Sequence, residues 1–90
     1  MELQRLRLFV AAAKAGGFSQ AAREEFMSHS TLSRAVAGLE RELGVELFRR
    51  NNHGLELSYA GALLLEEAEK LLAAADELEE KLRKLPKEMP

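Results

Sequence analysis

Apolar residues recur at helical spacing along most of the chain, and the breaks between these runs divide it into elements. The first run keeps one apolar face over residues 2–15 and stops at the glycine pair at 16–17. Ser19 follows Phe18, an apolar residue expected to be buried, and is placed to cap a short second helix over residues 20–26. The pattern therefore predicts two helices near the start of the chain.

A third helix is predicted directly after a very tight turn at residues 27 and 28. Ser28 is placed to accept a hydrogen bond from a free backbone N–H of the first turn, and Gly44 can adopt the left-handed conformation that ends a helix. Two helices joined by so tight a turn form a helix-turn-helix motif. One stripe of the third helix is apolar at spacings of four, three and four positions and is expected to be buried: Leu32, Val36, Leu39 and Leu43.

Alternating apolar and polar residues on both sides of an Asn- and Gly-rich loop at 51–54 predict a short β-hairpin. Its apolar strand positions are Val45, Leu47, Leu55 and Leu57.

Ser58 is placed to cap a last helix that continues until Pro86. At about 1.5 Å per residue this helix is roughly 40 Å long, too long to lie wholly against so small a domain. Its apolar positions alternate at spacings of four and three, which is the heptad pattern of a coiled coil. We therefore expect it to pair with a second copy of the chain through Leu64, Ala68, Leu71, Ala75, Leu78 and Leu82, with Leu85 completing the pattern.

The predicted fold class is mostly α: a winged helix-turn-helix with three helices and a two-stranded wing, followed by a long dimerisation helix. Residues 1–58 are the predicted winged helix-turn-helix DNA-binding domain, and residues 59–90 are the linker or dimerisation helix. A 90-residue chain with 47% apolar content supports one small core, and a cysteine count of zero excludes disulfides and thiolate metal sites.

The charge of the chain is unevenly distributed. A net charge of −2 argues weakly against nucleic acid as a partner, since domains that bind it are often strongly basic. Residues 1–58, however, carry eight Lys or Arg against seven Asp or Glu, whereas residues 59–90 carry five against eight. Because residues 1–58 are nearly neutral, each subunit is expected to neutralise few DNA phosphates and to bind DNA with modest affinity. Dimerisation is therefore expected to matter for DNA binding. The sequence has neither the apolar run of a membrane span nor a signal peptide, and we expect a cytoplasmic protein.

The exposed side of the third helix carries small and polar residues near its start, together with one arginine. Such residues permit close approach to a DNA groove, and Arg34 can donate to a guanine edge or to a phosphate. The alternatives are a solvated surface for Arg34 and local capping for the hydroxyls. Ser28 is expected to be mainly structural, although N–H groups beside it can hold a phosphate. The candidates on this helix are Ser28, His29, Ser30, Thr31, Ser33 and Arg34.

Ser28, His29 and Ser30 are adjacent but do not predict an enzyme. Neighbouring helical residues do not face one another, and no third residue is evident to orient the histidine. Two histidines without paired ligand spacing also fail as a metal site. We expect no enzymatic activity, no metal and no other cofactor.

Three stretches in combination carry a family resemblance: LQRLRLFVAAAKAGGFSQAA, LSRAVAGLERELGVELFRR and NHGLELSYAG. Over essentially its whole length the chain resembles the N-terminal winged helix-turn-helix domain and linker helix of LysR-type transcriptional regulators. The resemblance implies a dimer that binds double-stranded DNA, with residues 28–43 as the recognition helix. It also implies that residues 58–85 pair, usually antiparallel, with the same helix of a partner, and that a full-length parent forms a tetramer.

Carried over residue by residue, the resemblance places one set of side chains at the groove: His29, Ser30, Thr31, Ser33 and Arg34. It places Arg50 and the wing tip with His53 at the DNA backbone or minor groove. The family commonly has Gln and Pro at positions 29 and 30, often Gln at Ala35, and Arg at His53. A histidine at position 53 is only partly charged near neutral pH, which makes pH-sensitive binding an expectation.

The family normally continues into a large effector-binding domain, so we expect either a fragment or a short form without that sensor. The favoured function is a transcriptional regulator whose dimer sets two recognition helices into successive major grooves of a partly palindromic operator. Two alternatives stay open at this point. One is another winged-helix regulator, such as the molybdate-responsive type, and the other is a dimerisation or protein-interaction module without DNA binding.

Overall fold

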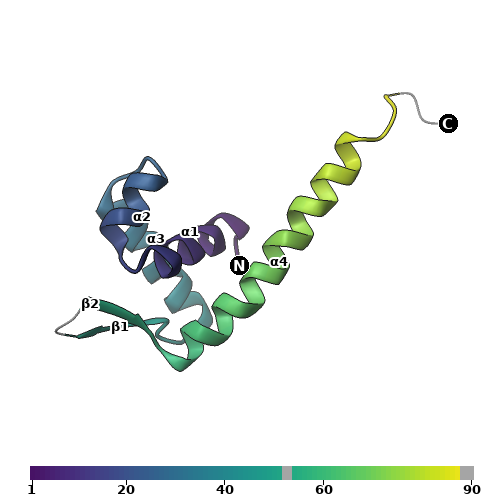
Figure 1. Cartoon of the computed structure of the whole chain (residues 1–90). Coiled ribbons are helices and arrows are strands. Elements are labelled where there is room, and N and C mark those ends of the chain that lie inside the picture. Colours follow the sequence, from purple (N-terminus) through teal and green to yellow (C-terminus); the bar gives the residue numbers. More distant parts are fainter. Residues whose placement is uncertain (52–53, 88–90) are drawn as a thin grey trace.

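The computed structural model describes residues 1–51 and 54–87, which form four helices and one two-stranded antiparallel sheet (Figure 1). The elements are α1 (Leu3–Ala15), α2 (Phe18–Glu24), α3 (His29–Leu43), β1 (Phe48–Asn51), β2 (Gly54–Leu57) and α4 (Tyr59–Arg83). Helices α1, α2 and α3 pack together as a unit that we call the head, and the C-terminal part of α4 extends beyond it. The predicted fold class is confirmed.

Three predicted helix ends are confirmed, two by hydrogen bonds of the capping side chain and one by the backbone conformation of a glycine. Ser28 Oγ accepts from the N–H of Thr31 at 3.1 Å, and Ser58 Oγ accepts from the N–H of Gly61 at 3.0 Å. Gly44 ends α3 in the left-handed conformation with φ 71°. These ends were predictable because capping depends on residues that are close in sequence.

The predicted start of the second helix is wrong. Helix α2 begins at Phe18 after Gly17, so Ser19 lies inside the helix and does not cap it. The Phe18 ring packs edge-on against Phe48 of the hairpin, with 5.5 Å between ring centroids. This contact is made with a residue far along the chain, and it outweighs the local capping preference of Ser19.

Phe26, predicted to be helical, lies after the end of α2 in the left-handed region with φ 55°, and its side chain is 96% exposed. A bulky residue in this conformation costs about 1 kcal/mol or more, and no burial of the ring offsets it. We expect Phe26→Asn or Phe26→Gly to raise the free energy of unfolding by about 1 kcal/mol in a urea titration. Glu25→Gly is the matched control, because Glu25 has φ −93° and gains nothing from glycine. An unchanged or lowered stability of the Phe26 variants would contradict the assignment of strain.

The first strand begins later than predicted. Val45 and Leu47 precede β1, whose register pairs Phe48 with Leu57 and Arg50 with Leu55. The backbone N–H of Leu47 donates to the Glu40 carboxylate, and its carbonyl accepts from the N–H of Ser58. The backbone N–H and C=O of Leu47 are therefore bonded to α3 and to the cap of α4. This explains why the pairing of β1 with β2 starts only at Phe48.

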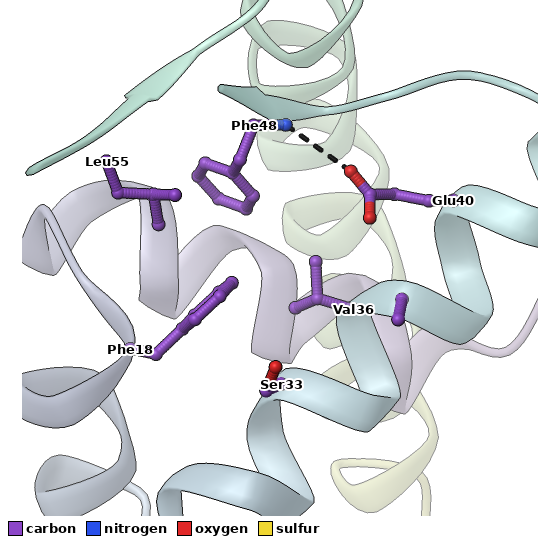
Figure 2. Close-up of a pocket in the computed structure, with 7 residues that line it drawn as sticks. Phe18, Ser33, Val36, Glu40, Phe48 and Leu55 are labelled. Carbon is purple, nitrogen blue, oxygen red and sulfur yellow. Dashed lines mark hydrogen bonds between the residues drawn. The ribbon is translucent and has the colours of Figure 1, made fainter. Parts of the chain in front are cut away.

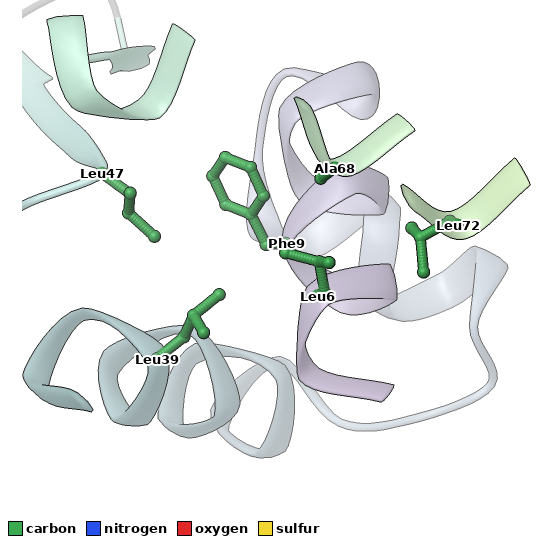
Figure 3. Packing of buried hydrophobic residues seen from close by; sticks show 6 residues of the cluster. All are labelled: Leu6, Phe9, Leu39, Leu47, Ala68 and Leu72. Atoms are coloured by element: carbon green, nitrogen blue, oxygen red, sulfur yellow. The ribbon is translucent and has the colours of Figure 1, made fainter. Parts of the chain in front are cut away.

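The core consists of two groups of buried residues. One lies between α1, α3 and the first half of α4 and contains Leu6, Phe9, Leu39, Leu47, Ala68 and Leu72 (Figure 3). The other joins the three helices of the head and contains Leu8, Ala12, Ala21, Ala22 and Leu32. The first half of α4 thus belongs to the chain's own core. Of the stripe predicted to be buried on α3, Leu43 alone is exposed.

The predicted intermolecular role of Ala68 is wrong, because its side chain is only 1% exposed and contacts the chain's own core. Two ion pairs between α1 and α4 lie along the same contact, Arg7–Asp76 at 2.8 Å and Lys14–Glu69 at 3.2 Å. The hydrogen bond to Asp76 and the attraction of its charge raise the pKa of Arg7.

Within the described residues, no helix combines the length and apolar character that crossing a bilayer requires.

Candidate nucleic-acid interface

The first turn of α3 presents a row of exposed polar side chains. Ser28 Oγ donates to Thr31 Oγ1 at 2.7 Å while it caps the helix, so the Ser28 hydroxyl is largely used within the protein. The Thr31 hydroxyl accepts in that bond and keeps its own proton for an outside acceptor. The exposed residues of this turn and the next are Ser28, His29, Ser30, Thr31 and Arg34.

His29 is exposed and also makes a contact that orients its ring. Its imidazole packs edge-on against Phe18 with 5.8 Å between ring centroids. The sequence did not indicate this contact, since Phe18 comes from α2 and the geometry depends on how α2 and α3 cross.

A pocket separates α3 from the hairpin, and Ser33 lines it (Figure 2). Ser33 is half-buried, unlike the five other candidates on this helix. The Phe48 ring points into the pocket from β1, and the Glu40 carboxylate accepts from the backbone N–H of Phe48 at its edge. Helix α3 and the hairpin thus lie next to each other on either side of this pocket. The pocket is lined by Phe18, Ser33, Val36, Ala37, Glu40, Phe48 and Leu55.

Two predicted contact residues belong to the hairpin. The backbone of Arg50 pairs with Leu55 in the ladder. The side chain of Arg50 and the whole of His53 lie outside the described residues. Arg49 pairs with Glu56 and is exposed.

One exposed cation on α3 was missed by the sequence analysis. Arg41 follows Arg34 by seven residues and is exposed. Residues seven apart lie on the same face of a helix, so the signal was present in the spacing.

The second half of α4 exposes three leucines and Leu85 follows its end, a set that we call the α4 stripe: Leu71, Leu78, Leu82 and Leu85. An apolar groove lies beside the first turns of α4, lined by Leu43, Val45, Leu47, Ala60, Leu63, Leu64 and Glu67. Of the other residues predicted for dimerisation, Leu64 and Ala75 are half-buried.

Comparison with protein-family models finds a match over residues 3–62 to the model described as "Bacterial regulatory helix-turn-helix protein, lysR family". Among curated proteins, the HTH-type transcriptional regulator TfdT of Cupriavidus pinatubonensis (strain JMP 134 / LMG 1197) is 45% identical over 73 residues. That alignment covers 81% of this chain and 32% of TfdT. The HTH-type transcriptional regulator BudR of Klebsiella aerogenes is 45% identical over 83 residues, 92% of this chain and 58% of BudR.

Two solved structures with similar folds are complexes with DNA. The BenM_DBD/catB site 1 DNA complex superposes with a TM-score of 0.93 at 30% identity, over 100% of both chains. The CbnR_DBD–DNA complex gives a TM-score of 0.86 at 36% identity, over 92% of this chain and 95% of that chain. The chain therefore spans the whole of an isolated DNA-binding domain and about a third of the TfdT regulator.

Proposed function

Because the chain belongs to the LysR family of bacterial helix-turn-helix regulatory proteins, we propose that it binds double-stranded DNA sequence-specifically as a homodimer. It is a DNA-binding domain of that family and not an enzyme, and the family assignment replaces the molybdate-responsive alternative. The observation that carries the proposal is the exposed polar tip of α3 in a fold that superposes over its whole length on a domain solved with DNA. Binding to operator DNA would place the protein in the bacterial cytoplasm.

In the proposed complex, the start of α3 enters the major groove. Ser30, Thr31 and His29 are exposed donors at the tip, and Arg34 follows one turn later on the exposed side. Arginine is the side chain best suited to two parallel hydrogen bonds with a guanine edge. Ser28 supports the complex indirectly, since its hydroxyl caps the helix. We propose that Arg50 and His53 of the wing contact the DNA backbone or minor groove.

The second element of the proposal is a dimer through α4. The α4 stripe has no partner within the described residues of the chain, and isolated helices expose such continuous apolar faces at a cost. An antiparallel pair is favoured because it covers the stripe of one chain and the apolar groove of the other at the same time. In that arrangement, the leucines at the end of one α4 lie near the apolar groove of the partner.

In this proposal, residues 1–58 contact DNA, and residues 59–90 form the linker through which two chains dimerise. A dimer of this kind contacts two half-sites separated by about one helical turn, roughly 10 bp, or a multiple of it. Its operator is therefore expected to be partly palindromic.

The DNA contact is tested by replacing Arg34 with Ala and titrating labelled duplexes selected by the wild-type protein from a random pool. Loss of a base-contacting arginine is expected to weaken operator binding about 5- to 150-fold and to relax specificity at one position. Arg50→Ala, at a proposed phosphate contact, is expected to weaken binding to all duplexes and to reduce the salt slope by about one. The measurement is fluorescence anisotropy over a range of salt concentrations.

Arg83→Ala is the matched control, because Arg83 lies at the far end of α4 and pairs there with Glu79 and Glu80. It removes the same charge far from the proposed groove contacts and is expected to leave affinity within about twofold. If Arg34→Ala and Arg50→Ala bind as the wild type does, the chain is a protein-interaction module and the DNA proposal is wrong.

A further inference from the structure

Residues 46–48 lie where the connection from α3 enters β1, and the side chain of Glu40 on α3 holds their backbone. Glu40 Oε2 accepts hydrogen bonds from the N–H of Leu47 at 2.7 Å and, more weakly, from the N–H of Phe48 at 3.4 Å (Figure 2). Both bonds are partly buried at the edge of the pocket between α3 and the hairpin. Hydrogen bonds to a charged carboxylate are stronger than those between neutral groups.

The opposite side of the same segment is held by α4. The N–H of Ser58 donates to the Leu47 carbonyl at 2.9 Å, and the Ser58 hydroxyl donates to the Glu46 carbonyl. The carbonyls of Glu46 and Leu47 are thus bound to Ser58, the N-cap of α4, and the N–H groups of Leu47 and Phe48 are bound to Glu40 of α3. Leu47 is also anchored by its buried side chain. Glu40 is therefore the polar link between the recognition helix and the first residue of β1.

We propose that Glu40 is a positioning residue for DNA binding, which holds the wing at a defined distance from the recognition helix so that both contact one duplex at once. The inference rests on the proposed function. A carboxylate on the DNA-facing helix repels phosphates, so its presence there needs a compensating role, and the two backbone bonds supply one. Because the Leu47 side chain and the Ser58 bonds remain without Glu40, its loss loosens the wing and leaves the core folded.

The effects of substitutions at Glu40 and Arg50 on DNA affinity are expected to depend on each other. If Glu40 acts through the wing, its replacement removes the benefit of a wing contact and leaves contacts of α3 unaffected. Glu40→Ala is expected to weaken operator binding about 10-fold, and Arg50→Ala is expected to cost much less in the Glu40→Ala background than in the wild type. Arg34→Ala is expected to cost the same in both backgrounds.

Two variants control for charge and for the hydrogen bond. Glu46→Ala removes an exposed carboxylate from the same segment and is expected to bind DNA at least as tightly as the wild type. Glu40→Gln keeps a carbonyl oxygen that can accept from Leu47, and it is expected to restore binding to within about threefold of the wild type. Rescue by Gln separates positioning by the hydrogen bond from an effect of charge.

The double-mutant cycles are measured by anisotropy with the selected operator duplex, and exchange of backbone amide hydrogens is measured by NMR on the same proteins. Coupling to Arg50 but not to Arg34, with faster exchange confined to the hairpin in Glu40→Ala, is the expected result. Additive effects of Glu40 and Arg50, or Glu40→Ala binding as tightly as Glu46→Ala, would overturn the proposal. If the wild type binds no duplex, the proposed function fails on its own, and unchanged exchange at Leu47, Phe48 and β2 would separately refute the role of Glu40.

Discussion

Replacing Leu78 by Asp is expected to convert the proposed dimer into monomers and to weaken operator binding at least about 100-fold. Leu78 is 59% exposed and belongs to neither group of buried core residues, so the substitution removes nothing from the chain's own core. In the proposed dimer, however, it would bury an unpaired carboxylate in an apolar interface, which is strongly unfavourable. A monomer contacts one half-site at a time and loses the gain in effective concentration that linkage provides. Binding to unrelated duplexes is expected to fall far less.

The measurement combines molar mass by light scattering with anisotropy titrations of operator and scrambled duplexes. Ala73→Asp is the matched control, because Ala73 is exposed on the same helix about 140° around the axis from Leu78. It introduces the same charge into the same helix and is expected to leave the dimer intact. A Leu78→Asp protein that remains dimeric, or an Ala73→Asp protein that dissociates, would show that the interface lies elsewhere.

Replacing Gly61 by Ala is expected to cause the largest loss of stability among single methyl additions to the helices. A Cβ at Gly61 would lie 2.1 Å from the Leu47 carbonyl oxygen and 2.9 Å from Leu57 Cδ2. The first of these is a backbone atom held by Ser58, so relief requires α4 to move away from the hairpin and to strain its own cap. The cost is expected to be about 3 kcal/mol, which outweighs the gain of roughly 1 kcal/mol in helix propensity. The melting temperature should fall by about 10 °C or more.

Gly38→Ala is the matched control for this substitution, since Gly38 lies inside α3 and gains the same helix propensity. Its added Cβ would meet the end of the Arg5 side chain at 3.3 Å, and that side chain can move. Gly38→Ala is expected to be neutral or stabilising by up to about 1 kcal/mol. Both variants are melted at one protein concentration, because the proposed dimerisation would make stability depend on concentration. Equal shifts of the melting temperature in Gly61→Ala and Gly38→Ala would contradict the steric explanation.

Several parts of the candidate interface were predictable because their signals are local. The cap at Ser28 and the helix end at Gly44 were found where the sequence placed them, and the exposed polar face of α3 followed from its apolar stripe. The contact of His29 with Phe18 and the two bonds of Glu40 were not predictable, because each joins elements whose relative placement the pattern does not encode. DNA contact by the predicted residues stays a prediction.

The amino-acid sequence by itself determined the order and approximate ends of the helices and the presence of a hairpin, because periodicity, caps and turn residues act over a few positions. It also determined that α4 has more apolar positions than a small head can cover. Only the tertiary structure decided which of them face inward: Ala68 and Leu72 complete the core, while Leu78 and Leu82 stay exposed. The physical reason is that a heptad pattern specifies one apolar face of a helix, and the crossing of α4 over α1 specifies which part of that face meets the chain's own core.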